Sequence, residues 1–431
     1  MLRTDSGSQT RERPATGEVP TRPGPARPRH RPTRGRIWGR RIVVLVVLAL
    51  IPVGWSYGHA VTVPGNGGVG VASVEWIRSH GGGWFVASVE NWWYRHHPPP
   101  EGGKPPPGYI RPVASGPGTG AVATGRSATT PRTPPTVATG RSATTVAAGS
   151  AHLPPPAPVA PIVTPPLPGE GVWHPIGRTV HGLPAVYAAD LRPDPVHTSL
   201  VTGVAWMDPE LLRAEMFAGS QEPGGGPWPY AAPIPSNLRT SLVAAFNSGF
   251  KLSDAHGGYY AYGKLAQPLV NGGASLVIYK NGTVTVGTWG SEVRMTPQVA
   301  AVRQNLTLII DHGRTVPGLA TSNFDQWGAT VDNQVLVWRS GVGVTANGAL
   351  LYAAGNGLSV SSLANVLVHA GAVRAMEMDI NYEWTDFFSF APAPGQPASP
   401  ANGTRLVPDM DQPPSRYLGP STRDFIAMFA R

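Results

Sequence analysis

The stretch SLVIYKNGTVTVGTW, residues 275 to 289, carries the strongest hairpin signal in the chain. Two runs rich in β-branched and aromatic residues flank the pair Asn281-Gly282. A type I′ turn requires positive φ at both residues of its two-residue loop. Asn and Gly tolerate positive φ, so the Asn-Gly pair favours this turn. The stretch therefore predicts a β-hairpin and, with it, a sheet for the surrounding domain.

The sequence on both sides of this hairpin predicts more short strands and one helix. Strands are expected at 200–206 and 242–246, and a second hairpin joins 335–345 to 349–354 across 346–348. The helix is predicted over 361–370, where an apolar face ends at Gly371. We therefore predict an α+β, sheet-dominated domain with hairpins and few helices over 171–431.

The positive charge of the chain lies almost entirely at its N-terminus. Residues 1–41 hold eleven arginines against Asp5, Glu12 and Glu18, which makes +8 of the formal +9. The rest of the chain is close to neutral, so the sequence does not favour nucleic acid as a partner. We expect 1–41 to be a disordered basic tail.

Residues 42–60 follow this tail and begin with ten unbroken apolar residues. With Trp55 and Tyr57 the segment is about as long as a membrane-spanning helix. Arginines before it and almost none after it predict an uncleaved signal-anchor, with a cytoplasmic N-terminus and an extracytoplasmic C-terminal domain. A cleaved signal peptide, with a small-x-small site at Gly58-His59-Ala60, is the alternative.

Two segments connect the anchor to the domain. Residues 61–96 are rich in tryptophan and predict either short amphipathic helices at the outer membrane surface or a small packed helical cap. Residues 97–170 are rich in Pro, Thr and Ala, and VATGRSATT occurs in them twice, at 122–130 and 137–145. We predict that 97–170 is a disordered spacer.

Several classes of chemistry are excluded or unsupported. The chain has no cysteine, which excludes disulfides, thiolate metal sites and cysteine nucleophiles. It has no G-x-S-x-G or H-E-x-x-H motif. The G-x-G-x-x-G spacing at 65–70 follows no predicted strand, and the Walker-type spacing at 258–264 is followed by Leu265 where Ser or Thr is needed.

The stretch RAMEMDINYEW, residues 374–384, has an unusual polarity. If it is extended, Glu377, Asp379, Asn381 and Glu383 share one face, while Met376, Met378, Ile380 and Tyr382 share the other. Such a strand is either an edge strand with a wetted outer face or part of a site. The alternating pattern alone leaves both interpretations open.

Two small polar loops add candidates. Asn247, Ser248, Gly249 and Phe250 follow an apolar strand, and Gly249 would let a ligand approach the backbone. Arg339 follows an apolar run in the first strand of the second hairpin, and its guanidinium could hold a phosphate through two parallel hydrogen bonds. Each pattern is also that of an ordinary turn or a surface ion pair.

The ordered set of motifs resembles the phosphodiester glycosidase domain over roughly 175–430. The set is N-x-G-F at 247–250, G-x-x-x-x-G-K at 258–264, R-S-G-V-G at 339–343 and a strand that ends at Asp379. The resemblance implies hydrolysis of a sugar whose anomeric carbon is bonded to a phosphodiester. It implies Asp379 and Glu377 as catalytic carboxylates, and Asn247, Gly249, Phe250, Arg339 and Asn381 as substrate-binding residues.

The resemblance requires no cofactor, although Glu377, Asp379 and Asn381 together offer oxygen ligands of the kind calcium prefers. The expected partners are the membrane, through 42–60, and an envelope glycan. The family's D-G-G-G-S loop is replaced here by Asp379-Ile380-Asn381-Tyr382-Glu383. A non-catalytic polysaccharide-binding or envelope-assembly protein is therefore the alternative.

Overall fold

The computed structural model describes residues 34–63, 68–83, 85–86, 88–89, 96–113, 152–319, 327 and 336–431. The chain divides into two compact units, Met1–Ser56 and Tyr57–Arg431. Most of the predicted basic tail, and both VATGRSATT repeats, lie outside the described residues. The helix α1 (Arg34–Thr62) contains a segment, Val43–Thr62, that is long and apolar enough to cross a membrane.

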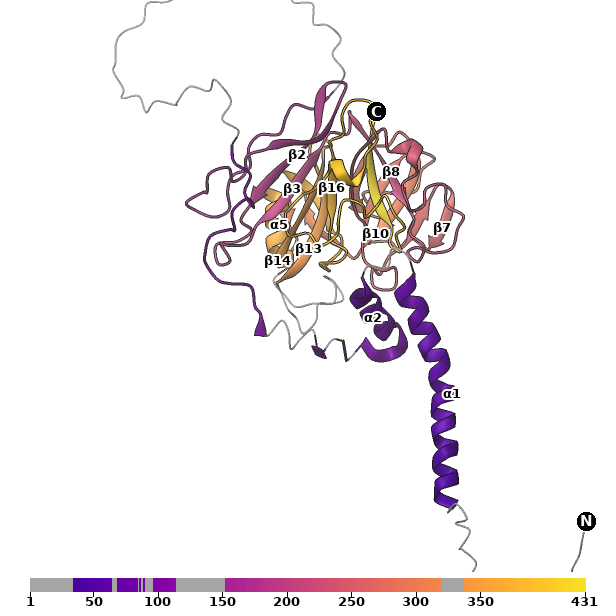
Figure 1. Cartoon of the computed structure of the whole chain (residues 1–431). Coiled ribbons are helices and arrows are strands. Elements are labelled where there is room, and N and C mark those ends of the chain that lie inside the picture. Colours follow the sequence, from indigo (N-terminus) through magenta and orange to yellow (C-terminus); the bar gives the residue numbers. More distant parts are fainter. Residues whose placement is uncertain are drawn as a thin grey trace, which may run out of the picture. The chain divides into compact units, whose positions relative to one another are not determined.

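Antiparallel sheets make up the C-terminal domain, which confirms the predicted α+β, sheet-dominated class (Figure 1). The eight-stranded sheet has the order β1 (His174–Val180), β2 (Leu183–Leu191), β3 (Thr202–Met207), β14 (Leu350–Leu358), β13 (Val337–Thr345), β15 (Ala372–Glu377), β11 (Leu308–Asp311), β12 (Arg314–Thr315). One five-stranded sheet has the order β7 (Lys264–Gln267), β6 (Tyr259–Ala261), β10 (Val299–Gln304), β8 (Ala274–Tyr279), β9 (Val284–Thr288). The other has the order β17 (Gly403–Arg405), β16 (Phe387–Phe390), β5 (Leu242–Asn247), β18 (Phe425–Ala430), β4 (Leu212–Phe217).

The main core is built from residues of all three sheets. Every residue of β5 is buried, as its continuous apolar run requires, and Phe246 stacks on Phe387 of the neighbouring β16. Tyr352 of the eight-stranded sheet packs against both rings. These ring contacts hold the ends of β5 and β16 against β14, and the candidate site lies there.

Both predicted hairpins are present, but the first has a different turn. β8 and β9 pair from Ala274 and Thr288 to Ile278 and Val284. Gly282 has φ 81°, whereas Asn281 is not among the residues with positive φ, so the turn is not type I′. Gly282 N donates to Tyr279 O, and the loop has the form of a type I turn followed by a glycine in the left-handed region.

The predicted helix is α5 (Val360–His369), which contacts the central strands of the eight-stranded sheet. Ser359 caps its N-terminus: Oγ accepts from Ser362 N at 2.9 Å, and Ser362 Oγ accepts from Ser359 N at 2.9 Å. Gly371, with φ 95°, ends it as predicted.

Loss of this cap gives a first prediction. Ser359→Ala should lower the free energy of unfolding by about 1 kcal/mol, because an N-terminal amide of the helix loses its acceptor. Urea denaturation of the purified protein measures the change. The exposed Asn365→Ala, in the middle of α5, is the control and should cost less. Equal losses in the two variants would contradict the role of Ser359.

Two segments predicted as spacer lie on the domain, and we call 98–113 and 152–170 the straps. In the first strap, Gly102 N donates to Val196 O at 2.7 Å, and Arg111 pairs with the buried Asp190. In the second strap, Val159 is buried and its N donates to Gly171 O at 2.8 Å.

A buried ion pair also fixes the second strap. Glu170 pairs with Arg192 at 2.8 Å, and Arg192 donates to the carbonyls of Val163 and Pro165. The folded part therefore begins earlier than the predicted boundary at residue 171, because prolines with a few apolar side chains can cover a sheet without forming strands of their own. Residues 114–151 lie outside the described part.

Candidate active site

Polar side chains converge where the ends of several strands meet. β5 lies between β16 and β18, and its register pairs Asn247 with Phe425 and Phe246 with Phe387. The residues just before β16 and β18 therefore lie beside the end of β5, and the loop after β15 reaches the same place. They form a small pocket that is partly open to solvent and has a cavity volume of about 10 Å³, lined by Asn247, Ser248, Gly249, Asp379, Trp384, Asp386, Arg416, Tyr417, Arg423 and Asp424.

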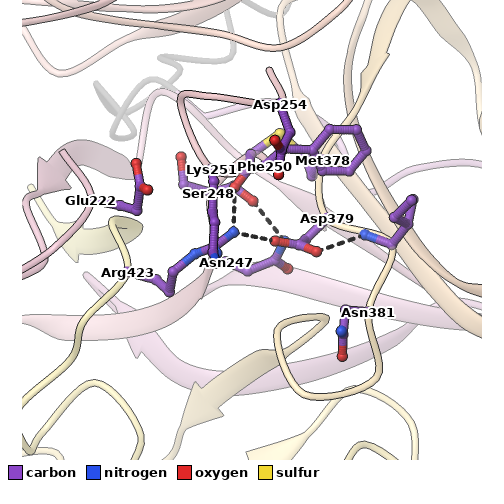
Figure 2. Close-up of polar contacts among 12 residues, drawn as sticks. Glu222, Asn247, Ser248, Phe250, Lys251, Asp254, Met378, Asp379, Asn381 and Arg423 are labelled. Carbon is purple, nitrogen blue, oxygen red and sulfur yellow. Dashed lines mark hydrogen bonds and ion pairs between the residues drawn. The ribbon is translucent and has the colours of Figure 1, made fainter. Parts of the chain in front are cut away.

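Asp379 is the predicted catalytic residue that reaches this pocket. Its Oδ1 accepts from Ile380 N at 2.8 Å, and its Oδ2 accepts from Arg423 Nη2 at 2.8 Å (Figure 2). Its main-chain oxygen accepts from Ser340 N at 2.8 Å. Burial raises the pKa of Asp379, and the Arg423 guanidinium opposes that rise.

Two arginines stand against one buried tryptophan in the pocket wall. The guanidinium carbons of Arg416 and Arg423 lie 4.8 and 5.1 Å from the centre of the Trp384 ring. Stacking on an aromatic ring fixes the plane of a guanidinium while its N–H edge stays able to bind an anion. The pocket thus offers two oriented cations.

Asp386 is a second carboxylate in the same pocket. Only 1% of the residue is exposed, and Tyr417 OH donates to its Oδ1. Arg416 Nε lies 3.8 Å from its Oδ2. Burial raises the pKa of Asp386 to about 7, although Arg416 and the Tyr417 hydrogen bond lower it.

Several buried polar atoms of the pocket have no hydrogen-bond partner among the described residues. They are Ser248 Oγ, Trp384 Nε1, Asp386 Oδ2 and Asp424 Oδ1. Most buried polar atoms in folded proteins have such a partner. A ligand that places one phosphate or hydroxyl oxygen in the pocket would supply a partner for some of these atoms.

The stretch RAMEMDINYEW is extended only in its first part. β15 ends at Glu377, and the backbone turns at Asn381, whose carbonyl accepts from Trp384 N and Thr385 N. The predicted alternation holds for the buried Met376 and Met378. It fails beyond them: Tyr382 is 47% exposed and Glu383 only 7%, because the turn reverses the direction of the side chains.

Of the predicted loop residues 247–250, some line the pocket and others pack behind it. Asn247 and Gly249 line the pocket, but the Asn247 amide is used internally: its Nδ2 donates to Ser340 Oγ at 3.0 Å, and its Oδ1 accepts from Tyr352 OH at 2.6 Å. Phe250 packs in a small apolar cluster and does not line the pocket.

Arg339 and Glu377 form a buried ion pair with each other. Arg339 is 3% exposed and Glu377 is fully buried, and Arg339 Nε also donates to Leu358 O at 2.9 Å. Burial raises the pKa of Glu377 to about 6, and Arg339 opposes the rise. The structure does not place either side chain in the pocket with Asp379.

The oxygen ligands considered for calcium are not brought together. Glu377 bonds to Arg339 and Asp379 to Arg423, while Asn381 Oδ1 accepts from Glu383 N at 2.9 Å. Within the described ranges, no group of three or more His, Asp or Glu side chains is placed to hold a metal ion. These residues do not fit a resident calcium ion.

Sequence reasoning missed Trp384, Asp386, Arg416 and Arg423. A signal existed for two of them, because Asp386 stands directly before the apolar run of β16, and Arg423 stands two residues before that of β18. A charged residue beside a buried strand needs a partner or a function. Arg416 and Trp384 lie in irregular segments, where no periodic pattern marks them.

Comparison with known proteins confirms the family resemblance. Residues 240–379 match the sequence model of the phosphodiester glycosidase family, and the matched segment ends at Asp379. The search of curated proteins gave no match. Asp386, Arg416 and Arg423 lie beyond the matched segment.

Two solved structures are similar to the chain. A hypothetical protein from Synechocystis is 13% identical with TM-score 0.34, and the similarity covers 60% of this chain and 64% of that one, which is less than two thirds of its length. A putative exported protein from Burkholderia pseudomallei K96243 is 11% identical with TM-score 0.25, over 56% of this chain and 76% of that one.

Proposed function

We propose that this chain hydrolyses the bond between an anomeric carbon and a phosphodiester in an envelope or extracellular glycan. The observation that carries the proposal is the place of Asp379. It ends the segment that matches the phosphodiester glycosidase family, and it lies in a pocket with Arg423. A carboxylate next to a guanidinium is what a reaction needs when positive charge develops on a sugar ring and negative charge on phosphate.

Each side chain then has a definite part. Asp379 stabilises the positive ring, either as nucleophile or through its charge, while Arg423 and Arg416 hold the phosphate. The phosphate role moves here from the predicted Arg339, because Arg339 is buried against Glu377 and does not line the pocket. Asn247 supports the pocket wall and does not bind the sugar, because its amide is hydrogen-bonded to Ser340 and Tyr352 within the protein.

Removal of one pocket cation tests this assignment. Arg423→Ala should raise KM for a sugar-1-phosphodiester by about 10-fold to 100-fold, because a hydrogen bond to a charged group contributes about 1.5–3 kcal/mol. The assay uses the full chain in detergent and the methyl phosphodiesters of glucose-1-phosphate and N-acetylglucosamine-1-phosphate, with the released methyl phosphate as readout. The exposed Arg314→Ala is the control. A KM that Arg423→Ala leaves unchanged would contradict the role of Arg423.

The anchoring proposal follows from α1. Its apolar segment Val43–Thr62 and the arginines before it support a single-pass protein with a cytoplasmic N-terminus. Because the chain has no cysteine, single cysteines can report on sidedness. A membrane-impermeant maleimide should label Asn347→Cys, on an exposed domain loop, and not Ser8→Cys in intact cells; the reverse pattern would contradict the orientation.

The second candidate is a non-catalytic polysaccharide-binding protein. The replacement of the family's glycine loop by residues 380–383 favours it, because the exposed Tyr382 offers a sugar-stacking ring instead of a backbone cradle. Glycan binding without any release of methyl phosphate would support this candidate and overturn the enzyme proposal.

A further inference from the structure

Asp386 is held on the pocket wall by its own backbone. Its carbonyl accepts from Asn247 N at 3.1 Å and from Tyr352 OH at 3.1 Å, and its N donates to Asn247 Oδ1 at 3.3 Å. These bonds fix the backbone of Asp386 to β5 and β14, and the hydrogen bond from Tyr417 OH to Oδ1 orients its carboxyl. The carboxyl is therefore held in place in the wall of the pocket.

The carboxyl has one satisfied oxygen and one open oxygen. Oδ1 accepts from Tyr417 OH, whereas Oδ2 has no hydrogen-bond partner in the described part of the chain. Arg416 Nε, at 3.8 Å from Oδ2, is too far for a hydrogen bond. A buried oxygen of this kind gains a hydrogen-bond partner when a bound molecule donates a hydrogen bond to it, or accepts one from its protonated form.

The charged and titratable groups around Asp386 act in opposite directions. Arg416 and Tyr417 lower its pKa, and burial together with the charge of Asp379 raises it, to about 7. Tyr352, whose OH touches the Asp386 carbonyl, has a pKa raised by burial and stays neutral. At neutral pH, Asp386 therefore exists in both protonated and ionised forms, as a general acid requires.

We infer that Asp386 is a catalytic acid–base residue that works with Asp379, whose carboxylate Arg423 neutralises. This inference rests on the proposed function. Two carboxyls in one pocket, one paired with a cation and one with an open oxygen, are the arrangement by which glycosidases divide the roles of acid and stabiliser. The partner sought on the sequence, Glu377, is replaced here by Asp386.

The proton balance is closed within the pocket. When the bond between the anomeric carbon and the phosphate oxygen breaks, the bonding pair leaves with that oxygen and Asp386 gives it a proton. Water then forms the new bond to the anomeric carbon and returns a proton to the Asp386 carboxylate. The products are a free sugar and a phosphate monoester, and Asp386 ends protonated, as it began.

The test is the pH dependence of kcat/KM for the full chain with the methyl phosphodiester of N-acetylglucosamine-1-phosphate. Since the protonated form gives the proton, kcat/KM should fall as pH rises through about 7. Asp386→Asn cannot give a proton, so kcat/KM should be about 10²-fold lower and lose this pH dependence. The exposed Asp411→Asn, on the segment that carries Arg416, is the matched control and should keep the profile.

Two further variants separate chemistry from folding. Tyr417→Phe removes the hydrogen bond that lowers the Asp386 pKa, so the falling limb should move to higher pH. Asp386→Ala should regain activity when formate is added, because a small acid can occupy the space of the lost carboxyl. A purely structural Asp386 would give neither result.

The outcomes are distinguishable. No turnover by the unmodified protein would overturn the proposed function and this inference with it. Turnover that Asp379→Asn abolishes, but whose size and pH profile Asp386→Asn leaves unchanged, would overturn this inference alone.

Discussion

Asp379→Asn is expected to lower kcat for sugar-1-phosphodiester hydrolysis by about 10³-fold, while the protein stays folded. The asparagine keeps the shape, and its single amide oxygen can accept from Ile380 N, but the NH2 group cannot accept from Arg423 and the negative charge that stabilises the ring is lost. Steady-state release of methyl phosphate measures the loss, and circular dichroism reports on folding. Because the charge matters most in the transition state, the loss should lie in kcat more than in KM.

The matched control is Glu383→Gln, on the same loop. Glu383 accepts from Gln412 Nε2 at 3.1 Å and does not line the pocket, so its loss of charge should change kcat only a few-fold by a rough estimate. A similar fall in both variants would mean that the loop, and not the Asp379 carboxylate, is what the change disturbs. An active Asp379→Asn would contradict the assignment directly.

Arg303→Ala is expected to reduce the free energy of unfolding by about 3–5 kcal/mol. Arg303 of β10 is fully buried; its Nε donates to Asp424 Oδ2 at 2.9 Å and its Nη1 to Gln304 O at 2.8 Å. The substitution leaves the Asp424 carboxylate buried without its cation, next to a cavity. Urea denaturation measures the loss, and the pocket wall at Asp424 should loosen with it.

An exposed pair provides the comparison. Arg374 pairs with Glu292, with 32% and 18% of the side chains exposed, and Arg374→Ala should cost under about 1 kcal/mol because water replaces the partner. Adding Asp424→Asn to Arg303→Ala should recover part of the loss, since no uncompensated charge then remains. Equal losses for Arg303→Ala and Arg374→Ala would contradict this account.

Local patterns predicted much of the fold. The hairpin at 275–289 and the helix ended by Gly371 depend on neighbours along the chain, and both are present. The turn at Asn281 differs from the predicted type I′ turn, because Asn-Gly also suits a type I turn that is followed by a glycine with positive φ. The straps were not predicted, because proline-rich segments carry no periodic signal and their burial depends on the sheet that they cover.

The site was predicted only where the family motif and a strand end coincide, at Asp379, Asn247 and Gly249. Its other half depends on the register of β5 with β16 and β18, which brings Asp386 to Asn247 across 139 residues of chain. A pattern within one segment cannot predict a contact between residues that lie so far apart in the sequence. Arg339 lies in a different sheet, on β13, and it pairs there with Glu377 of the neighbouring β15.

The straps change what residues 114–151 can do for the protein. Both ends of this stretch are held on one domain, through Arg111 with Asp190 on one side and Leu153 N with Asp208 on the other. A segment whose two ends return to the same domain does not lengthen the connection between α1 and the pocket. If α1 anchors the protein as proposed, a protease cut within 114–151 would yield two bands on a denaturing gel but would leave the domain attached to the cell.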